Sequence, residues 1–188
     1  MDLSMKHKKG SGTFLLLLIL LIAFAVAAFI YMSWYSGKTG RTSKARLSGS
    51  QGSMYAPPFT LKNILGEEFQ STQLARKPVV LNFFTTWCPS CREEIPGFVE
   101  VYAKYKESGL EVIGIALDAN KDPLPNFIAS YGINYRILIG NMETVRAFGG
   151  FRSVPMTFFI GKDGKIKDII AGYIDKAAFE AQVQELIR

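Results

Sequence analysis

The chain has 188 residues and a mass of 20.9 kDa, enough for one ordinary domain and about fifty further residues. Apolar side chains make up 48% and charged side chains 20%, which excludes a disordered or collagen-like chain. The net charge of +6 belongs entirely to residues 1–54, because residues 55–188 carry 15 basic and 15 acidic side chains. Since the larger part has no excess charge to attract phosphates, we expect no nucleic-acid partner.

The rare residue types exclude several kinds of chemistry. The single histidine, His7, lies near the N-terminus, which excludes Ser-His-Asp and Cys-His nucleophiles from the larger part. The two cysteines, Cys88 and Cys91, cannot close a four-ligand zinc site by themselves. Arg92 follows the second cysteine where a c-type haem attachment site needs histidine. We therefore expect no metal site and no attached c-type haem.

The N-terminal part predicts a membrane anchor. Residues 1–12 form a short basic tail, and residues 13–35 are 23 residues without charge that would span roughly 34 Å as a helix. Trp34 and Tyr35 stand at the end of this segment, where interfacial aromatic side chains are expected. We predict a single transmembrane signal anchor. The alternative is a cleaved signal peptide, for which 25–27 (Ala-Val-Ala) offers a cleavage pattern.

A linker and one domain follow the anchor. Residues 36–54 are rich in serine, glycine and basic side chains without an acid, which predicts a flexible tether with a reach of roughly 24 Å. Basic residues stand on both sides of the apolar segment, so their number does not decide its orientation. We place the domain, residues 55–188, outside the cytoplasmic membrane because of its chemistry.

The domain alternates predicted strands and helices. Residues 79–84 form a nearly continuous apolar run, as a buried parallel strand does. A helix follows the cysteines, with apolar side chains at helical spacing, and the last helix starts near Asp175 as its N-cap. The other predicted strands are 59–65, 110–117, 135–139, 156–160 and 166–170, and the other predicted helices are 123–131 and 142–148. This pattern predicts an α/β fold with a mixed central sheet and helices on both faces.

The most informative segment is 87–91, Trp-Cys-Pro-Ser-Cys, which lies between the buried strand and the helix. The backbone N–H groups at a helix N-terminus are unpaired and favour negative charge, so a cysteine placed there forms a thiolate more readily. We predict that Cys88 attacks a disulfide and that Cys91 resolves the mixed disulfide. The alternatives are a structural disulfide or two inert thiols.

The domain resembles the thioredoxin superfamily, and within it the TlpA/ResA/CcmG (DsbE)-type branch of membrane-anchored thiol-disulfide oxidoreductases. The strings that carry the resemblance are APPFTL at 56–61, VVLNFFTTWCPSCREEIP at 79–96, SVPMTFFI at 153–160 and KDGK at 162–165. The resemblance implies a thioredoxin fold without a cofactor, held by a single span in the cytoplasmic (inner) membrane. It also implies reduction of disulfide-containing protein substrates such as apocytochrome c, with a membrane electron donor of the DsbD/CcdA type as partner.

The resemblance also assigns roles to residues around the cysteines. Pro155 corresponds to a cis-proline that, with Val154, positions a substrate strand beside the thiols. Trp87 forms part of the docking surface, although a core role is the alternative. Pro89 and Ser90 stand between the cysteines, where they tune the reduction potential.

A proton acceptor for Cys91 is also implied. Thioredoxins carry a buried aspartate in the strand before the motif, whereas this chain has Asn82, which cannot accept a proton. Glu94 follows Cys91 by three residues, so its carboxylate can approach that thiol, and the resemblance gives it a catalytic role. The alternative is that Glu93 and Glu94 are ordinary acidic residues in the first turns of a helix.

Two other functions remain open. The opening APPFTL also resembles peroxiredoxins, but Leu81 stands where their cysteine motif has proline, although Thr85 fits that motif. A non-enzymatic copper-delivery module of the same fold would need a wider cysteine spacing and a histidine.

Overall fold

The computed structural model describes residues 11–36 and 54–188. They belong to two separate compact units, Met1–Ser43 and Lys44–Arg188. The predicted basic tail at 1–12 and the predicted linker at 36–54 lie almost wholly outside the described residues. Each unit is therefore described by itself.

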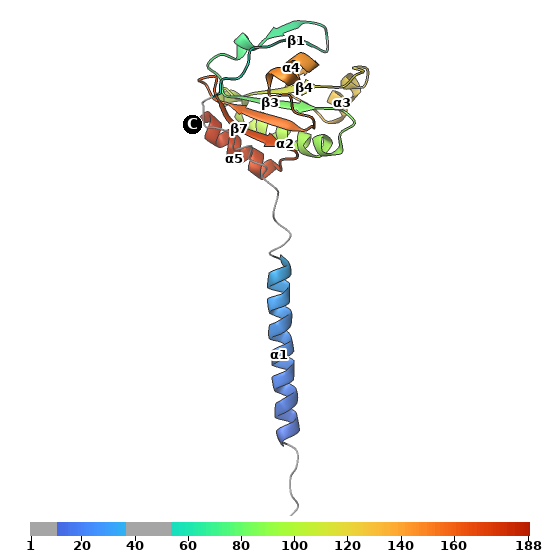
Figure 1. The fold of residues 1–188 in the computed structure, drawn as a ribbon, viewed down its shortest axis with the longest axis vertical. Coiled ribbons are helices and arrows are strands. Elements are labelled where there is room, and N and C mark those ends of the chain that lie inside the picture. The colour runs from blue at the N-terminus through green and yellow to red at the C-terminus, as the bar shows by residue number, and fades with distance from the viewer. Residues whose placement is uncertain (1–10, 37–53) are drawn as a thin grey trace, which may run out of the picture. The chain divides into compact units, whose positions relative to one another are not determined.

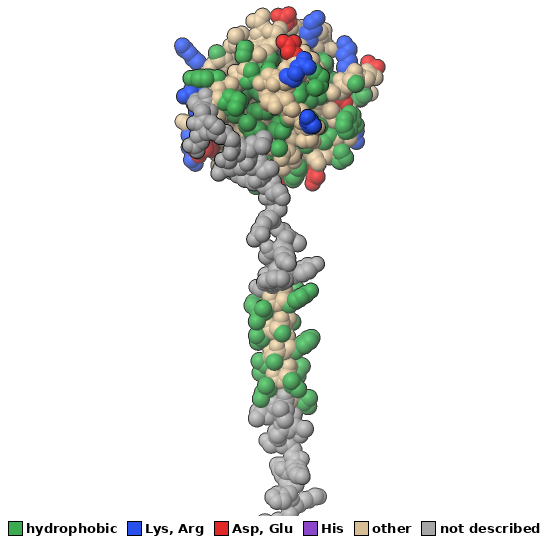
Figure 2. Space-filling view, in the orientation of Figure 1, with side chains coloured by type: hydrophobic (Ala, Val, Ile, Leu, Met, Phe, Trp, Pro, Cys, Tyr) green, Lys and Arg blue, Asp and Glu red, His purple; other side chains and the backbone are tan. Residues whose placement is uncertain are grey.

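The first unit contains the helix α1, Ser11–Ser36. Its described side chains, at 17 and 19–32, are apolar and exposed. Figure 2 shows hydrophobic side chains along both edges of this helix. Over the described residues, no helix is found that is long and apolar enough to cross a membrane. The anchor at 13–35 therefore stays a prediction.

The second unit is built on one mixed sheet of seven strands in the order β2-β1-β5-β4-β3-β6-β7. The central strands β3, β4 and β5 run parallel, and every other pairing is antiparallel. The strands are β1 (Thr60–Asn63), β2 (Glu68–Gln70), β3 (Val79–Phe84), β4 (Glu111–Ala116), β5 (Arg136–Ile139), β6 (Met156–Ile160) and β7 (Ile166–Ala171). The mixed central sheet expected from the sequence is confirmed.

Helices cover both faces of this sheet (Figure 1). One face packs against α2 and α5, which also contact one another, and the opposite face lies under α4. The helices are α2 (Pro89–Tyr105), α3 (Leu124–Ser130), α4 (Met142–Ala147) and α5 (Lys176–Ile187), with the short 3₁₀ turns η1 (Ser71–Leu74) and η2 (Lys106–Ser108). Phe98 of α2 and Phe179 of α5 stack with their ring centroids 3.9 Å apart, which holds the two helices together.

The strand predicted at 59–65 is shorter and is followed by a strand that the sequence did not predict. The Asn63 side chain accepts hydrogen bonds from the backbone N–H groups of Leu65 and Glu67, and Gly66 adopts φ +85°. These contacts close a tight turn, after which β2 pairs with β1. A strand of three residues is too short to show an alternating pattern, which is why it was missed.

The central strand β3 sets the position of the functional residues. All six of its side chains are buried, and they alternate between the two faces of the sheet. Val80 and Phe84 pack on the side of α2, so Asn82, which stands between them, faces α2 as well. It is the one polar side chain of the strand.

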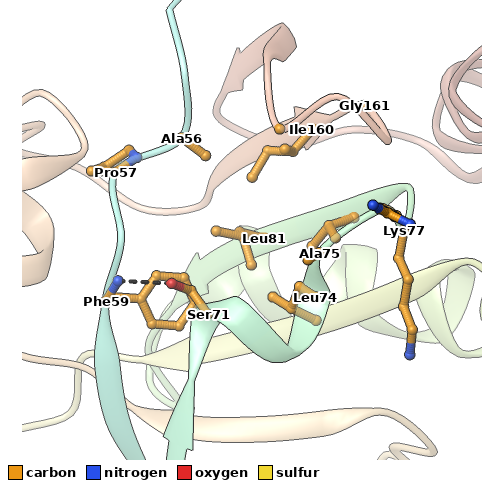
Figure 3. A pocket seen from close by; sticks show the side chains of 13 residues that line it. Ala56, Pro57, Phe59, Ser71, Leu74, Ala75, Lys77, Leu81, Ile160 and Gly161 are labelled. Atoms are coloured by element: carbon orange, nitrogen blue, oxygen red, sulfur yellow. Dashed lines mark hydrogen bonds between the residues drawn. The ribbon is translucent and has the colours of Figure 1, made fainter.

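A cavity of about 130 Å³ lies near the start of β3, at the other end of that strand from the cysteines (Figure 3). Apolar side chains such as Phe59, Leu81 and Ile160 line it, and neither cysteine does. The two cysteines therefore lie outside this cavity.

Candidate active site: a dithiol at a helix N-terminus

The two cysteines lie where β3 gives way to α2, as predicted. Cys88 is the N-cap of α2, and its backbone N–H donates to the carbonyl of Thr85 at 3.3 Å. The Cys88 sulfur takes the place of the usual capping oxygen and accepts a hydrogen bond from the Cys91 N–H at 3.3 Å. Negative charge on this sulfur is therefore favoured by a directed N–H group and by the helix dipole.

The two sulfurs have different access to solvent. Both are free thiols, with Cys88 6% exposed and Cys91 fully buried. The Cys88 sulfur lies 3.8 Å from the Val154 carbonyl oxygen, to which its S–H donates. The Val154–Pro155 peptide bond is cis, as the resemblance implies. A partner that approaches the Val154–Pro155 segment would therefore meet Cys88 first.

Cys91 holds its proton strongly. Burial raises the pKa of its thiol, and the hydrogen bond with Cys88 and the nearby charge of Glu94 raise that pKa further. A hydrogen bond from the backbone of Thr85 acts in the opposite direction. For Cys91 to act as a nucleophile, a neighbouring group must take its proton.

Glu94 is the acidic group placed under the dithiol. Its side chain is 2% exposed, and its two oxygens accept hydrogen bonds from Asn82 Nδ2 at 2.8 Å and from the backbone N–H of Ile174 at 3.3 Å. Burial raises the pKa of this carboxyl to about 8, although both hydrogen bonds lower it. Glu94 can therefore exchange a proton near neutral pH. The neighbouring Glu93 is exposed and lies outside the buried surroundings of the thiols.

Asn82 ties the carboxyl to the sheet. Its Nδ2 donates both to Glu94 and, at 3.1 Å, to Thr157 Oγ1, the residue opposite it on β6. Its Oδ1 is buried and has no hydrogen-bond partner among the described residues. The sequence showed that Asn82 cannot accept a proton, but its function as a donor to Glu94 was missed. One amide inside an apolar strand was the available signal.

A second group of polar contacts was also missed. Asp118, just after β4, accepts hydrogen bonds from the backbone N–H and the hydroxyl of Thr86, and Arg92 Nε donates to the Thr86 carbonyl at 2.6 Å. No pattern in the sequence connects these three residues, since only the parallel pairing of β3 with β4 brings Asp118 to this loop.

The remaining predicted residues lie at the surface around the thiols. Trp87 is 69% exposed, which excludes the core role and leaves its ring free for docking. Pro89 is exposed and Ser90 is half-buried. Within residues 11–36 and 54–188, no group of three or more His, Cys, Asp or Glu side chains is placed to hold a metal ion.

Comparison with known proteins gives three consistent findings. The AhpC/TSA family matches residues 54–169. Thiol-disulfide oxidoreductase ResA of Geobacillus thermodenitrificans is 31% identical over 169 residues, which cover 90% of this chain and 92% of the relative. Two crystal structures from Chlorobium tepidum cover 74% of this chain and their own full length. They are a thiol:disulfide interchange protein of the thioredoxin family (31% identity, TM-score 0.69) and a putative thiol:disulfide interchange protein DsbE (26% identity, TM-score 0.68).

The raised pKa of Glu94 predicts how stability depends on pH. The folded protein holds this proton up to about pH 8, whereas the unfolded chain releases it near 4.5, so the stability that it contributes is lost as pH rises between these values. Glu94→Gln should remove this dependence, worth roughly a few kcal/mol over the window. Urea denaturation from pH 5 to pH 8 measures it. An equal slope of unfolding free energy in both proteins would contradict the prediction.

Proposed function

The chain belongs to the AhpC/TSA family, and we propose that it is a thiol-disulfide oxidoreductase that reduces protein disulfides with Cys88 and Cys91. The observation that carries this proposal is the difference between the two sulfurs: Cys88, which is 6% exposed, caps a helix beside the cis-proline segment, and Cys91 is fully buried. The relatives named thiol-disulfide oxidoreductase ResA support the same chemistry.

In the first step, the Cys88 thiolate attacks one sulfur of a substrate disulfide. The substrate S–S bond breaks, a mixed disulfide with Cys88 forms, and the other substrate sulfur leaves as a thiolate. The Cys91 N–H and the N-terminus of α2 stabilise the attacking anion. Val154 and Pro155 position the substrate segment, and the exposed ring of Trp87 contributes to docking.

In the second step, the Glu94 carboxylate takes the proton of Cys91. The Cys91 thiolate then attacks the Cys88 sulfur, a disulfide forms between the two cysteines, and the second substrate thiolate leaves. Two electrons have then passed from the protein to the substrate. Pro89 and Ser90, which stand between the sulfurs, tune the reduction potential of the pair.

The cellular setting is part of the proposal. We propose that residues 13–35 anchor the chain in the cytoplasmic membrane by a single span, with the domain on the outer side. The uncharged sequence and the exposed apolar side chains of α1 support the anchor. From the resemblance to the TlpA/ResA/CcmG branch, we further propose apocytochrome c as a substrate and a membrane protein of the DsbD/CcdA type as the electron donor.

Trapping experiments test the roles of the two sulfurs. In Cys91→Ser, the mixed disulfide on Cys88 cannot be resolved by a second thiol, so covalent adducts with substrate proteins should accumulate. Cys88→Ser should form none, because the remaining thiol is buried. Non-reducing gels and mass spectrometry of the full-length variants measure the adducts. A peptide with an oxidised Cys-X-X-Cys-His segment, offered to the wild-type protein, tests the cytochrome-type substrate.

Other outcomes of the trapping experiment would point to inverted roles of the two sulfurs or to a different function. Adducts with Cys88→Ser alone would invert the roles of the sulfurs. Rapid consumption of hydrogen peroxide without any adduct would favour a thiol peroxidase, and stoichiometric Cu(I) binding without disulfide exchange would favour a copper carrier.

Glu94→Gln tests the proton transfer. Without the carboxylate, decay of the mixed disulfide should slow by about 10²-fold, the lower end of the range for general base catalysis. In the wild type this decay should accelerate as pH rises toward about 8 and then level off, because only the ionised carboxyl accepts a proton. The variant should lack this inflection. Glu93→Gln, an exposed neighbour, is the control, and equal profiles in both variants would remove Glu94 from the mechanism.

Fractionation tests the anchor. The full-length chain should remain in membranes washed with alkaline carbonate and should dissolve only in detergent, whereas a chain without residues 13–35 should be released. Protease added to spheroplasts should digest the domain. Recovery of a mature protein whose first residue lies just after Ala27 would show instead a cleaved signal peptide.

A further inference from the structure

We propose that Asp118 is a positioning residue for the dithiol: through Thr86 it fixes the peptide group whose carbonyl holds the backbone of Cys88. This inference rests on the proposed exchange activity, because it assigns a new residue to the same site. Asp118 belongs to neither the cysteine motif nor the cis-proline segment, and it reaches the site from the end of β4.

The N–H, the hydroxyl and the carbonyl of Thr86 all have hydrogen-bond partners. Its N–H donates to Asp118 Oδ1 at 3.0 Å and to Oδ2 at 3.1 Å, and its hydroxyl donates to Oδ1 at 2.6 Å. Its carbonyl accepts from Arg92 Nε at 2.6 Å. Two charged side chains from different elements therefore satisfy every polar group of this residue, which is 6% exposed.

The geometry of one peptide group connects this clamp to the cysteines. The N–H of Thr86 and the C=O of Thr85 belong to the same planar trans peptide, so they point in opposite directions. With the N–H held by Asp118, the carbonyl is directed toward the N–H of Cys88, which donates to it at 3.3 Å. Rotation of this peptide would break the hydrogen bond that holds the backbone of Cys88.

Asp118 holds the chain just beyond the point where the backbone hydrogen bonds between β3 and β4 end. The last ladder hydrogen bond between the two strands runs from the Leu117 N–H to the Phe84 carbonyl at 2.8 Å. Beyond it the chain leaves β3 to form the turn into α2, and the Asp118 carboxylate replaces the missing backbone partner. The turn is thereby held to β4 while Arg92 holds it to α2.

The test compares the full-length protein with Asp118→Ala, Asp118→Asn and the control Asp122→Ala, which changes an exposed aspartate in the same loop. The readouts are the rate of Cys88 alkylation by iodoacetamide and the rate of reduction of oxidised glutathione, both well below the unfolding temperature. Asp118→Ala should lower both rates about tenfold, as expected for the loss of hydrogen bonds to a charged group. Asp118→Asn retains one acceptor oxygen and should recover most of the rate.

A double-mutant cycle separates positioning from general stability. Thr86→Val removes only the hydroxyl donor, so its effect should be smaller, and adding it to Asp118→Ala should change the rates no further. If Asp118→Ala fails to fold, Asp118→Asn and Thr86→Val carry the same test. Folded variants of Asp118 that react as fast as Asp122→Ala would overturn the inference. A wild-type protein without disulfide exchange would instead overturn the proposed function.

Discussion

The site depends on one costly arrangement, the burial of the Glu94 carboxyl between α2 and β3. A carboxylate taken out of water is unfavourable unless hydrogen bonds replace its hydration. Here the amide of Asn82 and the N–H of Ile174 supply one hydrogen bond to each oxygen, and they only partly offset the loss of water. The result is an acid whose pKa lies near neutrality, which is what a group that accepts and returns a proton requires.

This arrangement brings together segments that are far apart in the chain. Asn82 comes from β3, Thr157 from β6, and Ile174 from the segment after β7. The same segment is joined to the cis-proline, because the Gly172 N–H donates to the Pro155 carbonyl at 2.8 Å. Gly172 is two residues before Ile174, whose N–H holds the Glu94 carboxyl. One continuous segment therefore joins the cis-proline, which we propose to position substrate, to the carboxyl that we propose to accept the proton.

The sequence was informative wherever the relevant contacts are local. The strand-turn-helix position of Cys88 and Cys91, and the i to i+3 relation between Cys91 and Glu94, follow from residues that are neighbours in the chain. The same reasoning could not choose between a surface role and a core role for Trp87, because exposure depends on the whole fold. For Asn82, the sequence showed only that its amide cannot accept a proton from Cys91. Its contact with Glu94 depends on which face of β3 the side chain occupies.

Contacts that depend on strand pairing were beyond the sequence. Asp118 lies 32 residues from Thr86, and only the parallel register of β3 and β4 makes them neighbours. The short strand β2 was missed for a different reason, since its three residues carry no periodic signal and the Asn63 turn defines it. Family resemblance did not help in either case, because it carried roles only onto residues within matching motifs.

The different environments of the two sulfurs follow from the geometry of α2. Cys88 caps the helix from outside its first turn, whereas Cys91 already lies on the face that packs against the sheet, in line with Glu94, Ile95 and Phe98. Two residues between the cysteines are enough to turn the second sulfur inward while its N–H still reaches the first. The same short segment therefore gives the Cys88 sulfur a directed N–H partner at the helix end, whereas burial raises the pKa of the Cys91 thiol. A pair with equal environments would lack the order of attack that we propose, since neither sulfur would be favoured to attack first.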